Sequence, residues 1–212
     1  MELKDLKEEH YKRLIKAISE IILKKGPSHT SMDYVASALN MSKRTLYELF
    51  GSKDDMIRHV LEYSTQKSKQ EIDEIFRSTP NALEAMHHLV VYLAGIHQKT
   101  SSEFLGDMDD RCKHLRAEFE EYHKEMIKQL SRVITLGIKQ GVFRKNRDLE
   151  MQIRVLFMQL ESLKRMEDFF PPDVTLGEVF MVIGRGFLRT IASSRGLEAL
   201  EQMEQKGIEK QQ

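Results

Sequence analysis

The spacing between two helix breaks near the N-terminus constrains the fold of this chain more than any other feature of its sequence. A Gly-Pro pair at residues 26–27 ends a helix, because glycine adopts the left-handed conformation cheaply and proline cannot continue the helical hydrogen-bond ladder. Between this pair and Ser52 there is room for only two short helices. Thr30 with Asp33 forms a capping box that predicts the start of the first, and Ser42 predicts the cap of the second. We therefore expect two short helices joined by a tight turn.

Longer amphipathic helices are expected on both sides of this pair. Before the Gly-Pro break, apolar residues recur at helical spacing and form a single stripe: Tyr11, Leu14, Ile15, Ile18 and Ile22. After the pair, Ser52 with Asp55 forms another capping box, which opens a helix that runs toward Phe76 and ends at residues 78–80. The N-terminal part is thus predicted to hold three helices followed by a fourth.

Helical periodicity continues to the C-terminal end, and no strand-like alternation competes with it. The periodic stretches lie near residues 81–98, 102–115, 117–140, 147–169 and 175–195, and Thr175 with Glu178 caps the last of them. Four prolines and no tryptophan also favour helices. We predict an all-α chain with a three-helix domain at residues 1–53, a linking helix at about 53–77, a larger helical domain at 78–200 and a fraying polar tail at 201–212.

The second short helix has the pattern of a DNA-reading helix. In a helix-turn-helix the second helix enters the major groove with an apolar underside and short or basic polar groups on its outer face. Leu46 and Phe50 supply the underside, and Lys43 and Arg44 are the expected base readers. The candidate DNA contacts are Thr30, Ser31, Ser42, Lys43, Arg44, Thr45, Tyr47 and Lys53. On spacing alone, a three-helix packing unit whose basic residues only solvate the surface remains an alternative.

Several spaced motifs resemble the DNA-binding domain of the TetR repressor family. They are residues 14–17, 24–26, 30–36 and 41–47, together with Phe50, Ser52 and Lys53. The resemblance implies a bacterial-type transcriptional repressor, in which a helical C-terminal domain dimerises and binds an inducer that releases the protein from a palindromic operator. Two positions depart from the family pattern. Leu49 stands where many members carry a histidine, which removes a polar contact, and Arg44 replaces a frequent glycine or proline, which offers an additional one.

Two C-terminal helices are apolar on more than one face, so that one face can form the core and the other can contact a partner. The resemblance implies a four-helix bundle between two copies of the chain, in which Gly184 and Gly186 allow close approach. The candidate interface residues are Leu156, Leu160, Leu163, Val179, Ile183 and Phe187. A two-fold reader of a palindrome must present two reading helices about 34 Å apart, which favours a homodimer over a wholly intramolecular core.

The middle helices are rich in methionine and aromatic residues, which suit the wall of a pocket for a bulky hydrophobic inducer. The candidate lining residues are Met86, Tyr92, Phe104, Met108, Phe119, Tyr122, Met126 and Phe157, with His88, His97 and Glu161 as polar groups among them. In this interpretation the ligand changes the setting of the linking helix and hence the spacing of the two reading helices. Because no covalent chemistry is required, we expect neither an enzyme nor a cofactor.

The overall charge constrains how DNA could be bound. Lysine plus arginine and aspartate plus glutamate both number 33, so the formal net charge is zero and any DNA affinity must come from local placement of basic groups. A single cysteine, Cys112, excludes an internal disulfide framework, and the first residues lack the apolar run of a signal peptide or membrane span. A cytoplasmic protein without a membrane partner is expected.

Three other classes of function are weighed against this one. A zinc site at Cys112 with His114, or at His87 and His88 with His97, does not match known ligand spacings, so no metal is expected. The Gly-Arg-Gly run at 184–186 could suggest an enzyme, but it lacks the third glycine and the preceding strand of a nucleotide-binding motif. The acidic group Asp107, Asp109 and Asp110 could bind a cation, but such a cluster between helices is typical of a solvated connection. A helical adaptor that binds no DNA is the main alternative, and it would lack the steep salt dependence of phosphate binding.

Overall fold

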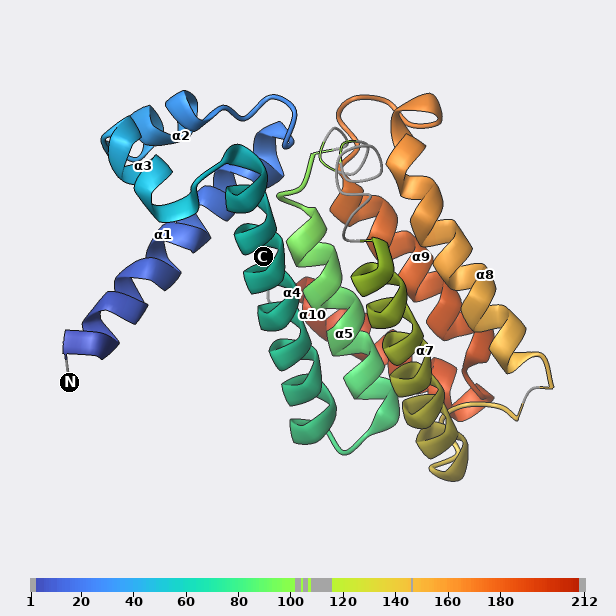
Figure 1. Cartoon of the computed structure of the whole chain (residues 1–212). Helices are drawn as coiled ribbons and strands as arrows, with labels where there is room; N and C mark the ends of the chain where they lie inside the picture. Colours follow the sequence, from blue (N-terminus) through green and yellow to red (C-terminus); the bar gives the residue numbers. More distant parts are fainter. Residues whose placement is uncertain (1–2, 102–103, 105–106, 108–115, 146, 210–212) are drawn as a thin grey trace. The chain divides into compact units, whose positions relative to one another are not determined.

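The computed structural model of the chain (Figure 1) describes residues 3–101, 104, 107, 116–145 and 147–209. Within those ranges every regular element is a helix, which confirms the all-α prediction. The helices are α1 (Leu3–Lys25), α2 (Met32–Ala38), α3 (Lys43–Phe50), α4 (Lys53–Ser78), α5 (Ala82–His97), α7 (Arg116–Lys139), α8 (Leu149–Ser162), the 3-10 helix η2 (Leu163–Asp168), α9 (Leu176–Ile191) and α10 (Ser194–Glu209). In the described part of the chain, no helix combines the length and apolarity needed to cross a bilayer.

The chain divides into two compact units, and each unit is formed by two separate segments of the sequence. The first unit comprises Met1–Glu71 and Lys99–Cys112, and the second comprises Ile72–Gln98 and Lys113–Gln212. One boundary therefore falls inside α4, whose first turns belong with α1, α2 and α3. The predicted stretch at 102–115 lies largely outside the described residues.

The connection after α5 is hydrogen-bonded to the rest of the first unit. The carboxylate of Asp107 accepts hydrogen bonds from the backbone N–H of Ser28, at 2.6 Å, and from the Ser28 hydroxyl. The backbone N–H of Ser101 donates to the carbonyl of Leu23 at 2.9 Å. The end of α1 and the loop that follows it are thus bonded to residues far along the chain.

The core of the first unit forms where the predicted apolar stripe of α1 meets the two short helices. Ile15, Ile18 and Ile22 are fully buried, as are Val35 of α2 and Leu46 of α3. The burial of these residues confirms the amphipathic pattern on which the three-helix prediction rested.

The breaks between these helices have the expected local geometry. Gly26 ends α1 with a φ of 76°, and its N–H donates to the carbonyl of Ile22 at 2.8 Å. Asn40 carries a φ of 53° in the turn between α2 and α3, a left-handed conformation that asparagine tolerates better than most residues. The tight turn predicted from the sequence is confirmed.

One predicted helix cap is wrong by one residue. Ser31, not Thr30, caps α2, because its hydroxyl accepts the N–H of Tyr34 at 3.1 Å. Thr30 is fully buried, and its hydroxyl donates to the carbonyl of Gly26 at 2.8 Å, just beyond the end of α1. The Ser42 cap is confirmed by the N–H of Thr45, which donates to its hydroxyl at 3.0 Å.

The second unit is built on a close contact between α5 and α9. A Cβ atom at Gly177 would lie 2.6 Å from the carbonyl oxygen of Ala94, and one at Gly184 would lie 2.6 Å from a methyl carbon of Val90. Gly184 therefore permits close approach within the chain and not to a partner, which corrects the sequence-based expectation. At Gly186 the space around a Cβ is open.

Around this contact, the second unit buries one apolar cluster that draws on the end of α4 and on α5, α7, α8, α9 and α10. Its largest fully buried members are Ile72, Leu83, Met86, Ile134, Ile153, Leu188 and Ile191. Among the helices of this unit, α9 contacts α5 and α8, and α5 also contacts α7.

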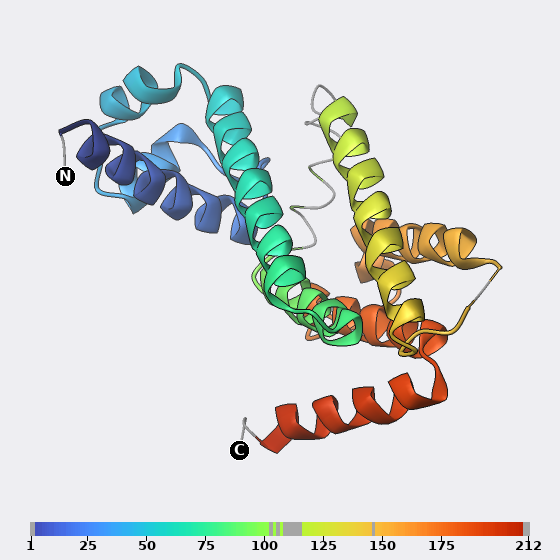
Figure 2. The same ribbon diagram turned by 90° about the horizontal axis from the view of Figure 1, so that it is seen from below.

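The C-terminal end differs from the expected single helix at 175–195. The capping box of Thr175 and Glu178 is present, but α9 ends at Ile191 and α10 begins at Ser194. The break is fixed by distant residues: the N–H of Arg144 donates to the Ile191 carbonyl, and the Ser193 hydroxyl donates to the Gly141 carbonyl. Figure 2 shows α10 turning back from the end of α9. It continues to Glu209, across most of the segment expected to fray.

Candidate nucleic-acid interface

The short helix α3 separates apolar from polar side chains. Leu46 and Phe50 are buried, whereas the outer face of α3 includes the exposed residues Lys43, Arg44, Thr45 and Tyr47. Ser42 is also exposed, and its hydroxyl lies 2.8 Å from that of Thr45. The two sides of the predicted reading helix are thus arranged as the pattern indicated.

The Lys43 ammonium contacts a carboxylate of the preceding helix. Its Nζ lies 2.6 Å from Oδ1 of Asp33 and 2.8 Å from Oδ2, so that both carboxylate oxygens are engaged. The hydrogen bond and the negative charge of Asp33 raise the pKa of Lys43 above its ordinary value. Sequence reasoning assigned Asp33 to a cap and missed this pairing, which joins α2 to α3 across the turn.

Arg44 is paired within its own helix. Its Nε donates to Oε1 of Glu48 at 2.8 Å, one turn further along α3. Such an exposed pair contributes little to stability and is easily exchanged for another acceptor. Both expected base readers therefore carry carboxylate partners that an approaching DNA acceptor would replace or share.

The N-terminal end of α2 contributes a smaller set than expected. Ser31 is exposed, whereas Thr30 is buried and bonded to Gly26, so that its hydroxyl is not on the surface and we remove it from the candidate contacts. Tyr34, which the sequence analysis did not single out, is 40% exposed, and the Nζ of Lys25 lies 3.8 Å from its ring centroid. The sequence signal for this pair was a lysine in the last turn of α1, followed by an aromatic residue in the first turn of α2.

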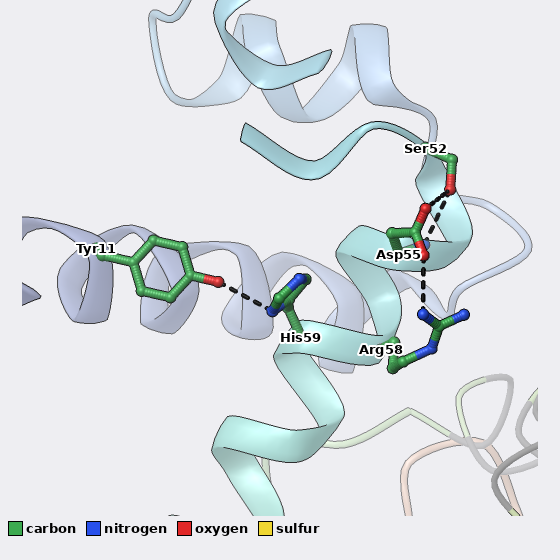
Figure 3. Close-up of polar contacts among 5 residues, drawn as sticks. All are labelled: Tyr11, Ser52, Asp55, Arg58 and His59. Carbon is green, nitrogen blue, oxygen red and sulfur yellow. Dashed lines mark hydrogen bonds and ion pairs between the residues drawn. The ribbon is translucent and has the colours of Figure 1, made fainter. Parts of the chain in front are cut away.

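At the start of α4 a polar chain fixes the helix terminus (Figure 3). The Asp55 N–H donates to the Ser52 hydroxyl at 3.1 Å, and that hydroxyl donates to Oδ2 of Asp55 at 2.6 Å, which confirms Ser52 as the cap. Arg58 donates to Oδ1 of Asp55 at 2.9 Å. The Ser52 hydrogen bond, followed by the charge of Arg58, lowers the pKa of Asp55. Lys53 at the same terminus donates to the carbonyl of Ser28 at 3.4 Å.

A second contact in Figure 3 joins α4 to α1. The hydroxyl of Tyr11 lies 3.1 Å from Nδ1 of His59, and the His59 ring lies 5.8 Å from that of Phe50, at the end of α3. Burial, with the nearby charge of Glu62, raises the pKa of Tyr11. These contacts tie the end of α3 to the two longer helices of the unit.

Replacing Ser52 by alanine tests the terminus of α4. We expect a loss of about 1 kcal/mol in the free energy of unfolding, since one helix cap is removed. The pKa of Asp55 should rise, because the largest cause of its lowering is gone. As the folded pKa in the wild type is lowered, the stabilisation from Asp55 is present above its unfolded pKa and is lost as the pH falls through the folded value.

Thermal unfolding at neutral and acidic pH, with an NMR titration of Asp55, measures both effects. Ser37→Ala is the control, because Ser37 is an exposed serine of α2, and it should change stability by no more than about 0.5 kcal/mol. An unchanged Asp55 titration in Ser52→Ala would contradict the assignment of the Ser52 hydrogen bond as the main cause.

The expected interface residues of the second unit lie mostly in its own core. Leu156, Leu163, Val179 and Phe187 are buried within the chain, and Leu160 and Ile183 are half-buried, so the predicted set describes the inner face of these helices. The outer face carries an exposed apolar stripe on α8 and α9, composed of Met151, Val155, Met158 and Val182. A groove between α8 and α9 is lined by part of this stripe and by Gly186 and Thr190.

The expected pocket residues are not gathered in one described site. Met86 and Met126 are buried in the core of the second unit, Tyr92 and Phe157 pack against it, and Phe104 belongs to the first unit. The structure of Met108 and the side chains of Phe119 and Tyr122 lie outside the described residues, as do Cys112, His114, Asp109 and Asp110.

Comparison with known proteins finds a family match within the first unit. Residues 14–60 match the family described as bacterial regulatory proteins, tetR family. The HTH-type transcriptional regulator YvaF of Bacillus subtilis (strain 168) is 35% identical over 83 residues, which cover 39% of this chain and 43% of YvaF. The match thus spans less than half of that relative.

Solved structures share the fold over most of the chain at low identity. A TetR-family regulator from Agrobacterium tumefaciens aligns with a TM-score of 0.67 at 14% identity, over 85% of this chain and 96% of that one. A transcriptional regulator from Saccharomonospora viridis in complex with choline gives 0.66 at 16% identity, over 88% and 99%. A cysteine mutant of the TetR-family regulator CifR, complexed with 26-base-pair operator DNA, gives 0.57 at 16% identity, over 84% and 95%. Residues 14–60 thus match the tetR family of bacterial regulatory proteins, and the chain shares its fold with several solved transcriptional regulators.

Proposed function

We propose that this protein is a dimeric, site-specific DNA-binding repressor, which holds a palindromic operator through α3 and releases it when a small molecule binds in the second unit. The observation that carries the proposal is the outer face of α3. It presents two cations and two hydroxyl side chains, fixed from below by Leu46 and Phe50, inside the segment that matches the TetR family.

The residues of this surface have different roles. Lys43 and Arg44 read base edges, since both can donate to the O6 and N7 acceptors of guanine in the major groove. Ser31, Ser42, Thr45, Tyr47 and Lys53 contact phosphates and set the register of the protein on the duplex. Because the net charge of the chain is zero, these few groups supply the affinity, and the CifR complex supports operator DNA as the partner.

A second copy of the chain is the proposed occupant of the exposed apolar stripe. Met158 is 65% exposed and Val182 is 71% exposed, and the open space at Gly186 leaves room for a helix from another copy beside them. Contiguous apolar side chains of this kind on two neighbouring helices favour association. A two-fold dimer would also supply the pair of reading helices that a palindrome requires.

The proposed ligand is small and largely hydrophobic. The second unit combines buried methionines with the aromatic residues Tyr92 and Phe157, and the choline complex of a structural neighbour supports a small molecule as the ligand class. His97 offers a polar anchor: its ring stacks on Phe180 at 4.9 Å, and its buried Nδ1 has no hydrogen-bond partner among the described residues. Burial lowers the pKa of His97, so a neutral imidazole would meet the ligand.

Selection of bound sequences from a random DNA pool tests the proposed function. An enriched palindrome supports a dimeric site-specific regulator. No enrichment at low salt overturns the proposal and favours a helical adaptor that binds no DNA.

Substitutions on α3 and α4 then separate base reading from phosphate contact. We expect Lys43→Ala and Arg44→Ala each to weaken discrimination at one base position by about 1–3 kcal/mol. Tyr47→Phe and Lys53→Ala should weaken binding to all sequences alike, because phosphates carry no sequence information. Competition binding with single-base variants of the selected operator measures the difference, and unchanged discrimination in the first pair would contradict the base-reading role.

A further inference from the structure

We propose that Asp33 is a specificity-determining residue, which positions the Lys43 ammonium toward base edges and away from phosphates. The inference rests on the proposed function, because it concerns how the same surface chooses among DNA sequences. Asp33 itself donates no hydrogen bond and would repel phosphate, so it acts through Lys43 as a positioning residue.

The geometry of the pair supports this role. Both oxygens of Asp33 contact the Lys43 Nζ, at 2.6 and 2.8 Å. An ammonium group has three N–H donors in a tetrahedral arrangement, so the carboxylate cannot engage all of them, and at least one faces away from Asp33 for an acceptor outside the protein. The pair therefore restricts a side chain that otherwise has wide rotamer freedom, and it does so at the first residue of α3, where the reading helix begins.

The charge of the pair favours bases over phosphates. The ion pair as a whole carries no net charge, so its attraction to a phosphate anion is reduced, whereas an N–H of the ammonium that faces away from Asp33 can still donate to the neutral O6 or N7 of guanine. Without Asp33, the free ammonium would bind whichever phosphate lay nearest. Asp33 thus lowers affinity for non-specific DNA more than affinity for the operator.

The exposure of the pair argues against a structural role. The Lys43 and Asp33 side chains are 56% and 65% exposed. An ion pair with this much solvent contact contributes little to the free energy of unfolding. Its effect should therefore appear in DNA binding, and removal of the carboxylate should leave the fold intact.

Asp33→Asn in the full-length protein tests the inference. We expect binding to non-specific duplex DNA to strengthen. The slope of log affinity against log salt concentration should become steeper by about 0.9, the value for one additional phosphate contact. The ratio of operator affinity to non-specific affinity should fall about tenfold, within the range for one base contact. Thermal unfolding should be unchanged, which separates this result from misfolding.

Two controls isolate the action through Lys43. Asp54→Asn removes the same charge from an exposed position at the start of α4, and it should raise all DNA affinities slightly without changing their ratio. In a Lys43→Ala background, Asp33→Asn should no longer change the salt slope, since the ammonium that it releases is absent.

The outcomes distinguish this inference from the proposed function. If the wild type selects an operator but Asp33→Asn keeps both its salt slope and its affinity ratio, the role of Asp33 is overturned and the repressor remains. The same holds if Asp33→Asn has an equal effect in the Lys43→Ala background. If the wild type selects no operator, both proposals fail together.

Discussion

Val182→Glu is expected to convert the protein from a dimer to a monomer and to lower its operator affinity about a hundredfold, equivalent to about 2.7 kcal/mol. Val182 is 71% exposed on α9, and the proposed dimer covers it with a second copy. An unpaired carboxylate buried in an apolar contact costs several kcal/mol, and a two-fold contact would bury two of them. Light scattering measures the oligomeric state, and titration of labelled operator measures the affinity.

Leu136→Glu is the matched control for this substitution. Leu136 is 44% exposed but lies on α7, outside the exposed apolar stripe, so a glutamate there should leave the dimer and its operator affinity unchanged. If Val182→Glu stays dimeric, the two copies associate through another surface. If Leu136→Glu also dissociates the dimer, the added negative charge causes the dissociation, wherever it lies on the surface.

Leu46→Ala should unfold the DNA-binding unit although it changes no group on the outer face of α3. Leu46 is fully buried beneath that face. Truncation of a buried leucine costs about 2–5 kcal/mol, a large part of the stability of a small domain. Operator binding should be lost, and circular dichroism on heating should show an early transition ahead of the unfolding of the second unit.

The neighbouring leucine provides the comparison on the same helix. Leu49 is 45% exposed, and Leu49→Ala should change stability by no more than about 0.5 kcal/mol and leave the α3 fold intact. Equal losses at the two positions would mean that the inner and outer sides of α3 have been assigned wrongly. Normal unfolding of Leu46→Ala would mean that the buried side of α3 contributes far less than its burial indicates.

The sequence predicted those features that depend on a few neighbouring residues. The end of α1 is such a feature, whereas the end of α9 was not predicted. Gly26 ends α1 through its own backbone conformation, which a short sequence reveals. The end of α9 is set by Arg144 and Gly141, about fifty residues away in sequence, which bond to Ile191 and Ser193. The local signal was weaker: Ser193 caps α10 by accepting the N–H of Gly196 at 3.1 Å, and the sequence analysis did not use it.

Tertiary contacts also decide which of two similar residues caps a helix and which of two apolar residues on one helix is buried. Thr30 and Ser31 can both cap a helix. The hydroxyl of Thr30 is buried and bonded to Gly26, so Ser31 is the residue that caps α2. On α9, Val179 and Val182 are equally apolar, but packing within the second unit buries the first and leaves the second exposed. The outer face of α3 could be predicted from the sequence. The pairing of Lys43 with Asp33 could not, because it depends on the angle that the turn sets between α2 and α3.

The bonds from Ser28 to Asp107 and from Ser101 to Leu23 bear on how such regulators could be recombined. A chimaera made by one crossover inside α4 would join the Met1–Glu71 segment of one protein to the remainder of another, and Ser28 would then face a foreign residue in place of its carboxylate. Because the first unit also includes Lys99–Cys112, a functional graft must carry two separate pieces of the gene. Exchange of DNA specificity between relatives therefore requires a double crossover, or the substitution of single residues on α3.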